Sequence, residues 1–448
     1  MFLTGFVCET HLRFAPLVLV RGEWRTYNYA LNLKGDAPAQ GKMDISVVNI
    51  EENAGQVPVN YVLPPGVTRI IDPGQSQITQ LNEQAMSLKV TDLQSGDARA
   101  VYKNSGMDMR TYKRLQMFVH AEKLIDDKTN LRDGDVSVFL RLGSDSKSNY
   151  YEYEVPLSLT EPGNYSTYNA QDQEAVWPQS NMFDFPLSLF TDLKLERNAK
   201  KRMDNSTVTF QTRYSSYDPD KNQNKVTIVG NPSLSDVRTM MIGVRNNSNA
   251  AKDIVVWVNE MRLTDFDQSG GWAAKANVNL GLSDIAMLNI AGHVETVGFG
   301  GIDQSLTERR LDDYYQYNIA TMVELGRFLP EKVKLKAPLF YSITEQRTSP
   351  KYNPLDQDIL LKDALDNAGS KAERDSISDA SIEKSTVESF SLSGVSFDIR
   401  SKNPMPYDPA NFSISYSYNR QSKQDPTPNL RIHTMSLRLT SRLLLMIH

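Results

Sequence analysis

The chain has 448 residues, which is enough for two or three domains. Charged residues make up 23% of it and the net charge is −5, so it lacks the basic stripe that nucleic-acid binding requires. The mean hydropathy is −0.45 and no run of 18 apolar residues occurs, which excludes a membrane-spanning helix. A barrel of strands is not excluded, because only every second residue of such a strand is apolar.

Residues 1–83 are predicted to be extended β segments that end in a connector rich in proline and glycine. The connector, 51–83, contains one Pro-Pro-Gly and one Pro-Gly sequence, which interrupt any long regular element. Met1–Leu12 has neither a basic start nor an apolar core, so it does not resemble a secretory signal. We therefore expect the chain to be an internal piece of a longer protein. The single cysteine, Cys8, cannot form an internal disulfide.

Residues 84–265 are predicted to form one β-sandwich of the jelly-roll kind, because short β-rich runs alternate with Gly, Pro and Asx turns. A long polar insertion, 163–224, interrupts it, and helical spacing of leucines predicts one helix at Leu187–Lys201. The expected strands are Met86–Val90, Leu115–Glu122, Ser137–Leu142, Tyr150–Leu157, Lys225–Val229, Thr239–Arg245 and Asp253–Leu263. The expected core residues are Leu88, Phe118, Val138, Leu140, Tyr151, Ile228, Ile242, Val256 and Val258.

From residue 272 the pattern changes to long strands with one apolar and one polar face. Residues 272–282 read WAAKANVNLGL, in which successive side chains point to opposite faces. Such a strand is near the roughly 10 residues that a tilted strand needs to cross a bilayer core. The expected hairpins pair 272–282 with 287–297, 314–326 with 333–344, and 389–400 with 411–420, and a further strand begins near Met435. The expected lipid-facing residues are Trp272, Val278, Leu280, Tyr317, Ile319, Leu335 and Leu339.

The connections between these strands alternate between short and long, as in outer-membrane barrels, which have short periplasmic turns and long external loops. The short ones lie near 283–286, 327–332 and 401–410, and the long ones at 298–313, 345–386 and 421–432. The loop at 345–386 contains a predicted helix, Asp356–Arg374. Residues 272–440 are therefore predicted to be transmembrane hairpins of a large barrel. Six or seven strands are fewer than the 8 of the smallest barrel, so this chain alone gives an incomplete one.

Motifs that would carry chemistry are weak. The segment from Asp218 to Asn224 has acidic spacing, but Gln223 and Val229 stand where a calcium loop needs Gly and Glu, which favours a solvated turn. His293 lies on the polar face of a strand beside Glu295, where a lumen-facing residue is expected rather than a metal ligand. No signature of a nucleophile, zinc, phosphate or dinucleotide site occurs. We therefore assign no catalytic, cofactor-binding or metal residue and expect a protein that is not an enzyme.

Several segments carry a resemblance to a known family. They are PVNYVLPPGV at 58–67, SLKVTDLQSGDARAVYKN at 87–104, YKRLQMFVHA at 112–121, RLGSDSKSNYYEYEVPL at 141–157, VTIVGNPSLSDVRTMMIGVRNNS at 226–248, VWVNEMRLTDFDQSGGWAA at 256–274, SPKYNPLDQDILLKDALD at 349–366 and SKNPMPYDPANF at 401–412. Together they resemble the SprA/Sov family of gliding motility and type IX secretion, over about residues 14–420.

This resemblance implies a fragment of an outer-membrane β-barrel that conducts folded cargo proteins, needed for secretion and for gliding motility. It implies three kinds of protein contact, namely secreted cargo, a PorV-type barrel partner and a periplasmic plug protein, in addition to outer-membrane lipid. It also places the region in the N-terminal part of the family and at the outer membrane or cell surface.

A second interpretation stays open at this stage, in which the chain is a cell-surface β-sandwich adhesin or glycan-binding module and 272–440 is further soluble β structure. The charges of the C-terminal strands discriminate between the two. Lys275, Glu295, Glu324, Lys334 and Lys336 are expected opposite the apolar face, and a lipid-facing charge near mid-membrane would cost about 2–4 kcal/mol. The pattern therefore favours the barrel.

Overall fold

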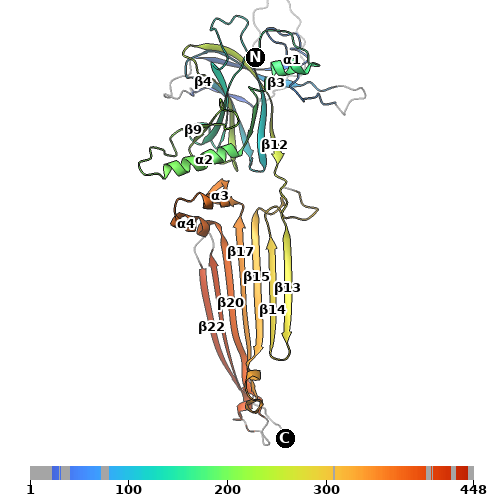
Figure 1. Ribbon diagram of the computed structural model, residues 1–448, viewed down its shortest axis with the longest axis vertical. Helices are drawn as coiled ribbons and strands as arrows, with labels where there is room; N and C mark the ends of the chain where they lie inside the picture. Colours follow the sequence, from blue (N-terminus) through green and yellow to red (C-terminus); the bar gives the residue numbers. More distant parts are fainter. Residues whose placement is uncertain are drawn as a thin grey trace, which may run out of the picture.

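The computed structural model describes residues 23–29, 31, 41–71, 80–305, 308–399, 405, 407–424 and 430–441. Figure 1 shows two bodies, a β-sandwich and a long, narrow sheet that extends from one end of it. Most of the regular structure is strand, so the all-β expectation is confirmed. Within the described residues, no helix is both long enough and apolar enough to cross a membrane.

The sandwich consists of two antiparallel sheets. The first has the order β1 (Arg25–Tyr27), β4 (Ala98–Met107), β11 (Val237–Asn246), β6 (Val136–Gly143), β7 (Tyr150–Pro156), β10 (Lys225–Val229) and β9 (Tyr214–Tyr217). The second has the order β2 (Lys42–Asn49), β3 (Gln84–Leu93), β12 (Lys252–Phe266), β5 (Tyr112–Glu122) and β8 (Phe183–Pro186). All seven strands expected between 84 and 265 are present within a few residues of their expected ends.

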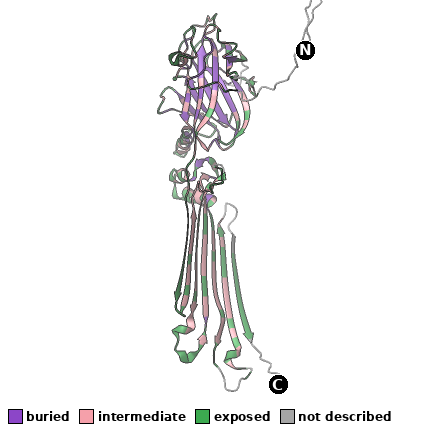
Figure 2. Ribbon diagram, turned by 90° about the vertical axis from the view of Figure 1, so that its right-hand side faces the viewer, coloured by how far each residue is buried: buried purple, intermediate pink, exposed green. Residues whose placement is uncertain are grey.

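One apolar core lies between the two sheets, and it contains eight of the nine expected residues, all except Phe118. Phe118 lies between Met117 and Val119 on β5, and those two neighbours point into the core. Phe118 therefore points to the opposite face of its sheet, where it packs in a second cluster around Trp177 and Trp257. Figure 2 shows that buried residues gather in the sandwich, whereas the long sheet is intermediate or exposed.

The sandwich takes in more of the chain than the strand pattern predicted. β1 and β2, which precede residue 84, pair with β4 and β3, and β4 itself was not predicted. The segment 163–224 contributes an edge strand to each sheet and two helices, α1 (Ala170–Val176) and α2 (Ser188–Lys201). The helix expected at Leu187–Lys201 is thus confirmed as α2. The domain boundaries at 83, 265 and 272 remain predictions.

The long sheet is a set of antiparallel hairpins. Its order is β13 (Ala273–Leu282), β14 (Ala286–Glu295), β15 (Asp312–Glu324), β17 (Pro338–Pro350), β20 (Glu383–Phe397), β21 (Phe412–Gln424) and β22 (Leu430–Ser441). The three expected strand pairs and the further strand are present, although the strand expected at 333–344 begins only at Pro338. Both sheets of the sandwich and this sheet are open, so the jelly-roll connectivity and the closure into a barrel remain predictions.

The connection between β15 and β17 is longer than the expected turn. It holds two 3-10 turns, η2 (Leu325–Phe328) and η3 (Glu331–Val333), and Lys334 adopts a left-handed conformation with φ 48°. Pro330 directly precedes the second turn, with φ −55° and ψ 139°. As a result Leu335 does not face β15. It lies in a two-residue strand, β16 (Leu335–Lys336), that pairs with β20.

The prediction of one helix at Asp356–Arg374 is wrong, because its first five residues form a strand and residues 367–370 separate two short helices. The connection 351–382 contains a small hairpin, β18 (Tyr352–Asn353) with β19 (Asp356–Leu360), and then α3 (Leu361–Asp366) and α4 (Lys371–Ser381). A capping residue decides the start of α4, because the Ser370 hydroxyl accepts a hydrogen bond from the Glu373 backbone N–H at 3.1 Å. A last 3-10 turn, η4 (Pro409–Asn411), precedes β21.

Candidate functional site

One face of the long sheet carries an apolar surface. Because antiparallel partners share a face, the register places Val278, Ile290, Ile319 and Ile343 in one row across β13, β14, β15 and β17. The next row towards the short turns holds Leu280, Leu288, Thr321, Tyr341, Phe390, Tyr418 and Met435. Several of these apolar side chains are exposed to an unusual degree: Leu280 is 48% and Met435 67% exposed. A surface this apolar and this large marks contact with a partner or a membrane.

The opposite face is polar and hydrogen-bonded across strands. Asn289 donates to Asn277 at 3.3 Å, and Asn318 donates to Thr344 at 2.6 Å. One row departs from this pattern near the short turns, where Met287 and Met322 of β14 and β15 lie beside Phe340. Val387 and Ile432 add two apolar side chains in the row of Asn318 and Thr344. Most of the face is nevertheless polar, as the face that lines a water-filled interior is.

Charges also occur on the apolar face, contrary to the expectation that these strands avoid them. They lie on β17, β20 and β21 near the long connections, where Lys384 is 3.0 Å from Glu345 and Arg420 is 3.7 Å from Glu388. Lys275, Glu295 and Glu324 do lie on the polar face, as expected. The apolar surface is therefore a band of limited height rather than the whole face.

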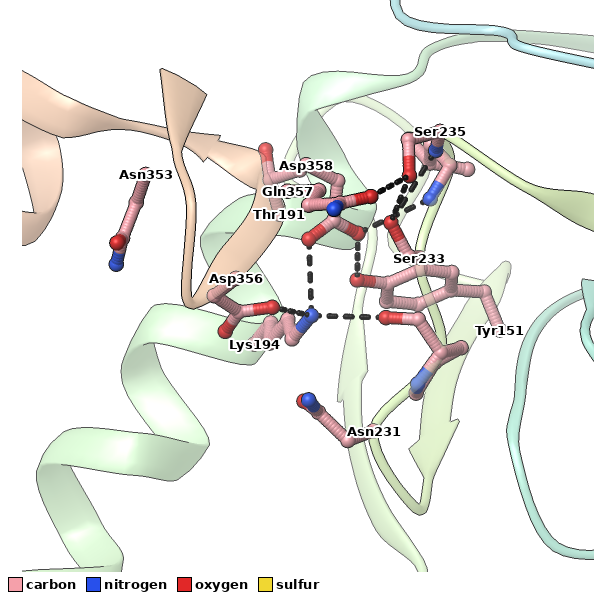
Figure 3. A network of polar contacts seen from close by, with 12 residues as sticks. Tyr151, Thr191, Lys194, Asn231, Ser233, Ser235, Asn353, Asp356, Gln357 and Asp358 are labelled. Carbon is pink, nitrogen blue, oxygen red and sulfur yellow. Dashed lines mark hydrogen bonds and ion pairs between the residues drawn. The ribbon is translucent and has the colours of Figure 1, made fainter. Parts of the chain in front are cut away.

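The sandwich is joined to the long sheet by a buried ionic network between α2 and the connection 351–382 (Figure 3). The side chain of Lys194 on α2 is fully buried, and its Nζ donates to Asp358 Oδ1 at 2.9 Å and to the Pro232 carbonyl at 2.8 Å. It also pairs with Asp356 at the start of β19. All three donors of the ammonium group are thus used, as a buried charge requires.

The second oxygen of Asp358 connects this network to the sandwich core. It accepts a hydrogen bond from the Tyr151 hydroxyl at 2.6 Å and from the Leu234 N–H at 3.2 Å. Burial raises the pKa of Tyr151 well above its ordinary value, and the adjacent carboxylate of Asp358 adds to this. Burial likewise raises the pKa of Asp356, although Lys194 opposes the shift. The network therefore consists of one buried cation with two carboxylates, one of which a neutral phenol also supports.

Two further contacts flank the network. Arg110 lies 4.4 Å over the ring of Tyr352 and donates to the Gln357 carbonyl at 2.8 Å. Next to this contact, Lys351 Nζ lies 2.9 Å from Asp267 Oδ2, directly after the end of β12. Hydrogen bonds from Lys351 and Ser269 hold the pKa of Asp267 well below its ordinary value. Together these contacts fix the sandwich on the connection that follows β17.

Sequence reasoning assigned no site residue, and it missed this network for a specific reason. A helix was predicted at a segment that is in fact the strand β19. Asp356 and Asp358 are two residues apart on this strand, so their side chains lie on the same face. The signal on α2 was a lysine on the apolar stripe, because Lys194 is buried beside Phe190 and Leu193.

Asp218, considered as a calcium ligand, instead accepts a hydrogen bond from the Tyr153 hydroxyl at 2.6 Å. His293 is 2.9 Å from Glu295 on the polar face.

Comparison with known proteins identifies the family. Residues 1–365 match the family SprA_N, described as motility related/secretion protein. The chain belongs to this family. The match begins earlier than the resemblance at residue 14 and ends within the connection that carries the ionic network, so it covers the sandwich, β13–β17 and most of the junction. The protein is therefore related to motility and secretion.

Two other comparisons add no functional information. No curated protein matches the chain. Among solved structures, the chain is similar to a family 11 carbohydrate-binding module of the cellulosomal cellulase Lic26A-Cel5E of Clostridium thermocellum. The two are 10% identical with a TM-score of 0.24, over 55% of this chain and 89% of that one. At this TM-score the similarity carries no conclusion about a ligand.

Proposed function

We propose that the long sheet is part of the wall of an outer-membrane protein-conducting barrel, and that the chain serves type IX secretion and gliding motility without catalysing a reaction. The observation that carries this proposal is the exposed apolar band opposite a hydrogen-bonded polar face. Exposure of such an apolar band to water is unfavourable. In a barrel wall, lipid covers the band and the polar face lines the channel. Outer-membrane lipid and secreted cargo are the proposed contacts, with a PorV-type barrel and a periplasmic plug protein as the proposed partners.

The slope of the band supports a membrane rather than a protein partner. Its upper edge lies at Val294 on β14 but at Met435 on β22, and the ladder aligns Met435 with Leu288 of β14. Along the strands, the edge therefore descends by the distance from Val294 to Leu288, which is roughly 20 Å at about 3.3 Å per residue. Across the strands, this descent takes five strand spacings of about 4.8 Å each. This slope corresponds to a strand tilt of about 40°, which is typical of outer-membrane barrels.

The charged rows agree with the same slope. Glu388 and Arg420 are in the same row as Ile343 and Ile319, and they lie at the sloping edge of the band because the edge is lower on β20 and β21. A pair at this position reaches the headgroup region, where a charge costs about 0–1 kcal/mol rather than the 2–4 kcal/mol of the midplane.

We further propose that the sandwich caps the barrel on the cell-surface side. The sandwich lies at the end of the sheet that carries the connections 298–311 and 351–382, away from the turn at 283–285 (Figure 1). Long connections are external in outer-membrane barrels. The ionic network around Lys194 then keeps the cap at the rim of the channel, where it can limit which cargo passes.

The test is cysteine scanning with a lipid-soluble thiol reagent in the chain reconstituted in vesicles, after Cys8→Ser. Cysteines at Val278, Leu280 and Ile319 are expected to react, whereas cysteines at Asn277 and Asn279 are expected to react only with a water-soluble reagent. Equal reaction of both faces with the lipid-soluble reagent would overturn the proposal.

A further inference from the structure

A groove of about 390 Å³ crosses the outer face of the five-stranded sheet of the sandwich. Its floor comes from β2, β3, β12 and β5, and its walls from the segments 53–58 and 123–126. It lies near the ends of β12 and β5 marked by Val255 and Glu122, whereas β12 joins the long sheet at its other end, beyond Phe266. The groove is therefore remote from the junction and independent of it.

A buried carboxylate lies in this groove without a hydrogen-bond partner. Glu122 is 2% exposed, and its Oε2 receives no hydrogen bond from any residue that the structure describes. The nearest cationic candidate is His120, whose Nε2 is 3.8 Å away and also lacks a partner. The other ring nitrogen of His120 lies 2.7 Å from the Val176 carbonyl, so it carries the proton there.

Such a carboxylate is unfavourable unless something pairs with it. Buried charges in proteins are paired or hydrogen-bonded, because desolvation otherwise strongly disfavours the ionised form. No lysine or arginine among the described residues lies within 4.0 Å of Glu122, although Lys89 and Lys123 line the same groove. The missing partner is thus expected to come from outside the chain and to be a cation or a strong donor.

The walls indicate the shape of that partner. Exposed aliphatic side chains flank the groove, with Val47 54%, Val57 67% and Ile125 71% exposed. Lysine and arginine combine an apolar stem with a cationic end, so they pack along aliphatic walls while the end reaches a carboxylate. The groove spans β2 to β5, or about 14 Å at roughly 4.8 Å per strand, which is room for about four extended residues.

We propose that this groove binds an extended peptide segment that presents a lysine or arginine side chain to Glu122. Ser87, which is 4% exposed on β3, lines the same groove and offers a hydroxyl acceptor to the peptide. A glycan fits less well, because none of the described residues that line the groove has an aromatic ring to stack on a sugar. This inference depends on the sandwich alone and stands whether or not the long sheet crosses a membrane.

The experiment is calorimetric titration of the full chain in detergent with the pentapeptide acetyl-Ser-Val-Lys-Val-Ser-amide. A matched peptide carries norleucine in place of lysine, and cellohexaose is titrated separately. Saturable binding of the lysine peptide is expected, with the norleucine peptide at least about tenfold weaker. Glu122→Gln is expected to weaken the lysine peptide by about tenfold or more, because a charge-assisted pair is lost. Asp204→Asn, an exposed carboxylate outside the groove, is expected to bind as the unchanged chain does.

A second variant protects the test against misfolding. Ser46 is exposed at the β2 end of the groove, so Ser46→Trp blocks the groove without entering the core and is expected to weaken the lysine peptide similarly. The proposal is overturned if the lysine peptide does not bind, if the norleucine peptide binds equally, or if both variants bind normally. Binding of cellohexaose that Glu122→Gln abolishes would replace the peptide by a glycan.

Discussion

Lys194 Nζ lies 2.9 Å from Asp358 Oδ1, although 164 residues separate the two along the chain. This pair joins the sandwich to a connection of the long sheet, and both side chains are fully buried. Breaking a buried pair by removing one partner leaves an uncompensated charge. The junction is therefore the place where single substitutions should separate the two bodies.

Lys194→Met is expected to lower the free energy of unfolding of the sandwich by about 3–5 kcal/mol, because Asp356 and Asp358 are then buried without a cation. Urea unfolding, followed by the fluorescence of the buried Trp177 and Trp257, measures this change in the free energy of unfolding. Lys200→Met is the control on the same helix, since Lys200 is 47% exposed in its pair with Glu196 and its replacement should change stability little. Equal losses in the two variants would mean that the network does not stabilise the sandwich.

Ile242→Ala is expected to destabilise the sandwich by about 2–5 kcal/mol, because it opens a cavity in the core between the two sheets. Ile70→Ala makes the same chemical change at a residue that is 69% exposed, and should be nearly neutral. Lys252 is not a suitable surface control, since it is 6% exposed and lies 2.7 Å from Asp135. Comparison of the two melting temperatures checks the core assignment, which fails if they agree.

Val278→Lys and Asn277→Lys place the same charge on opposite faces of β13. If Val278 faces lipid near the midplane, the first variant should lose about 2–4 kcal/mol of folding free energy in vesicles, and the second should change little. Reversible unfolding of the chain reconstituted in lipid vesicles measures both. A larger loss for Asn277→Lys would reverse the assignment of the faces.

Asp267→Asn tests the pH dependence of the junction. The pKa of Asp267 is lowered in the folded protein, so its ionised form stabilises the fold at any pH above its ordinary value of 3.8. That contribution is lost progressively as the pH falls below about 4 towards the lowered pKa. The melting temperature of the unchanged chain should therefore fall more steeply between about pH 4 and 2.5 than that of Asp267→Asn. Parallel curves would show that the Lys351 contact has no energetic role.

The orientation of the sheet can be tested in intact cells that carry the full-length protein. A protease site inserted after Ile302, in an exposed long connection, is expected to be cut from outside. The same site inserted after Asp284, in the short turn, is expected to be cut only after the outer membrane is ruptured. The reverse pattern would place the sandwich in the periplasm.

The amino-acid sequence by itself determined the strands of the long sheet and most of the sandwich core. Strict alternation, as in 272–282, predicts a strand locally, because side chains of a strand point to opposite faces whatever the neighbours are. The same local rule predicted Ile242 and Val256 as core residues. Where local rules competed, prediction failed: the leucines near 360 suggested a helix, but Asp356 and Asp358 pair with Lys194 only if that segment is extended.

Only the tertiary structure decided the two sites. A lysine on an apolar stripe indicates that Lys194 needs a buried partner, but that partner lies far away in the sequence and cannot be identified from it. The groove at Glu122 arises because β5 and β12 are neighbours and place Val255 opposite Glu122. The slope of the apolar band likewise needs the register of six strands. Sequence periodicity gives the face on which a side chain lies, whereas packing across the chain determines what that side chain meets there.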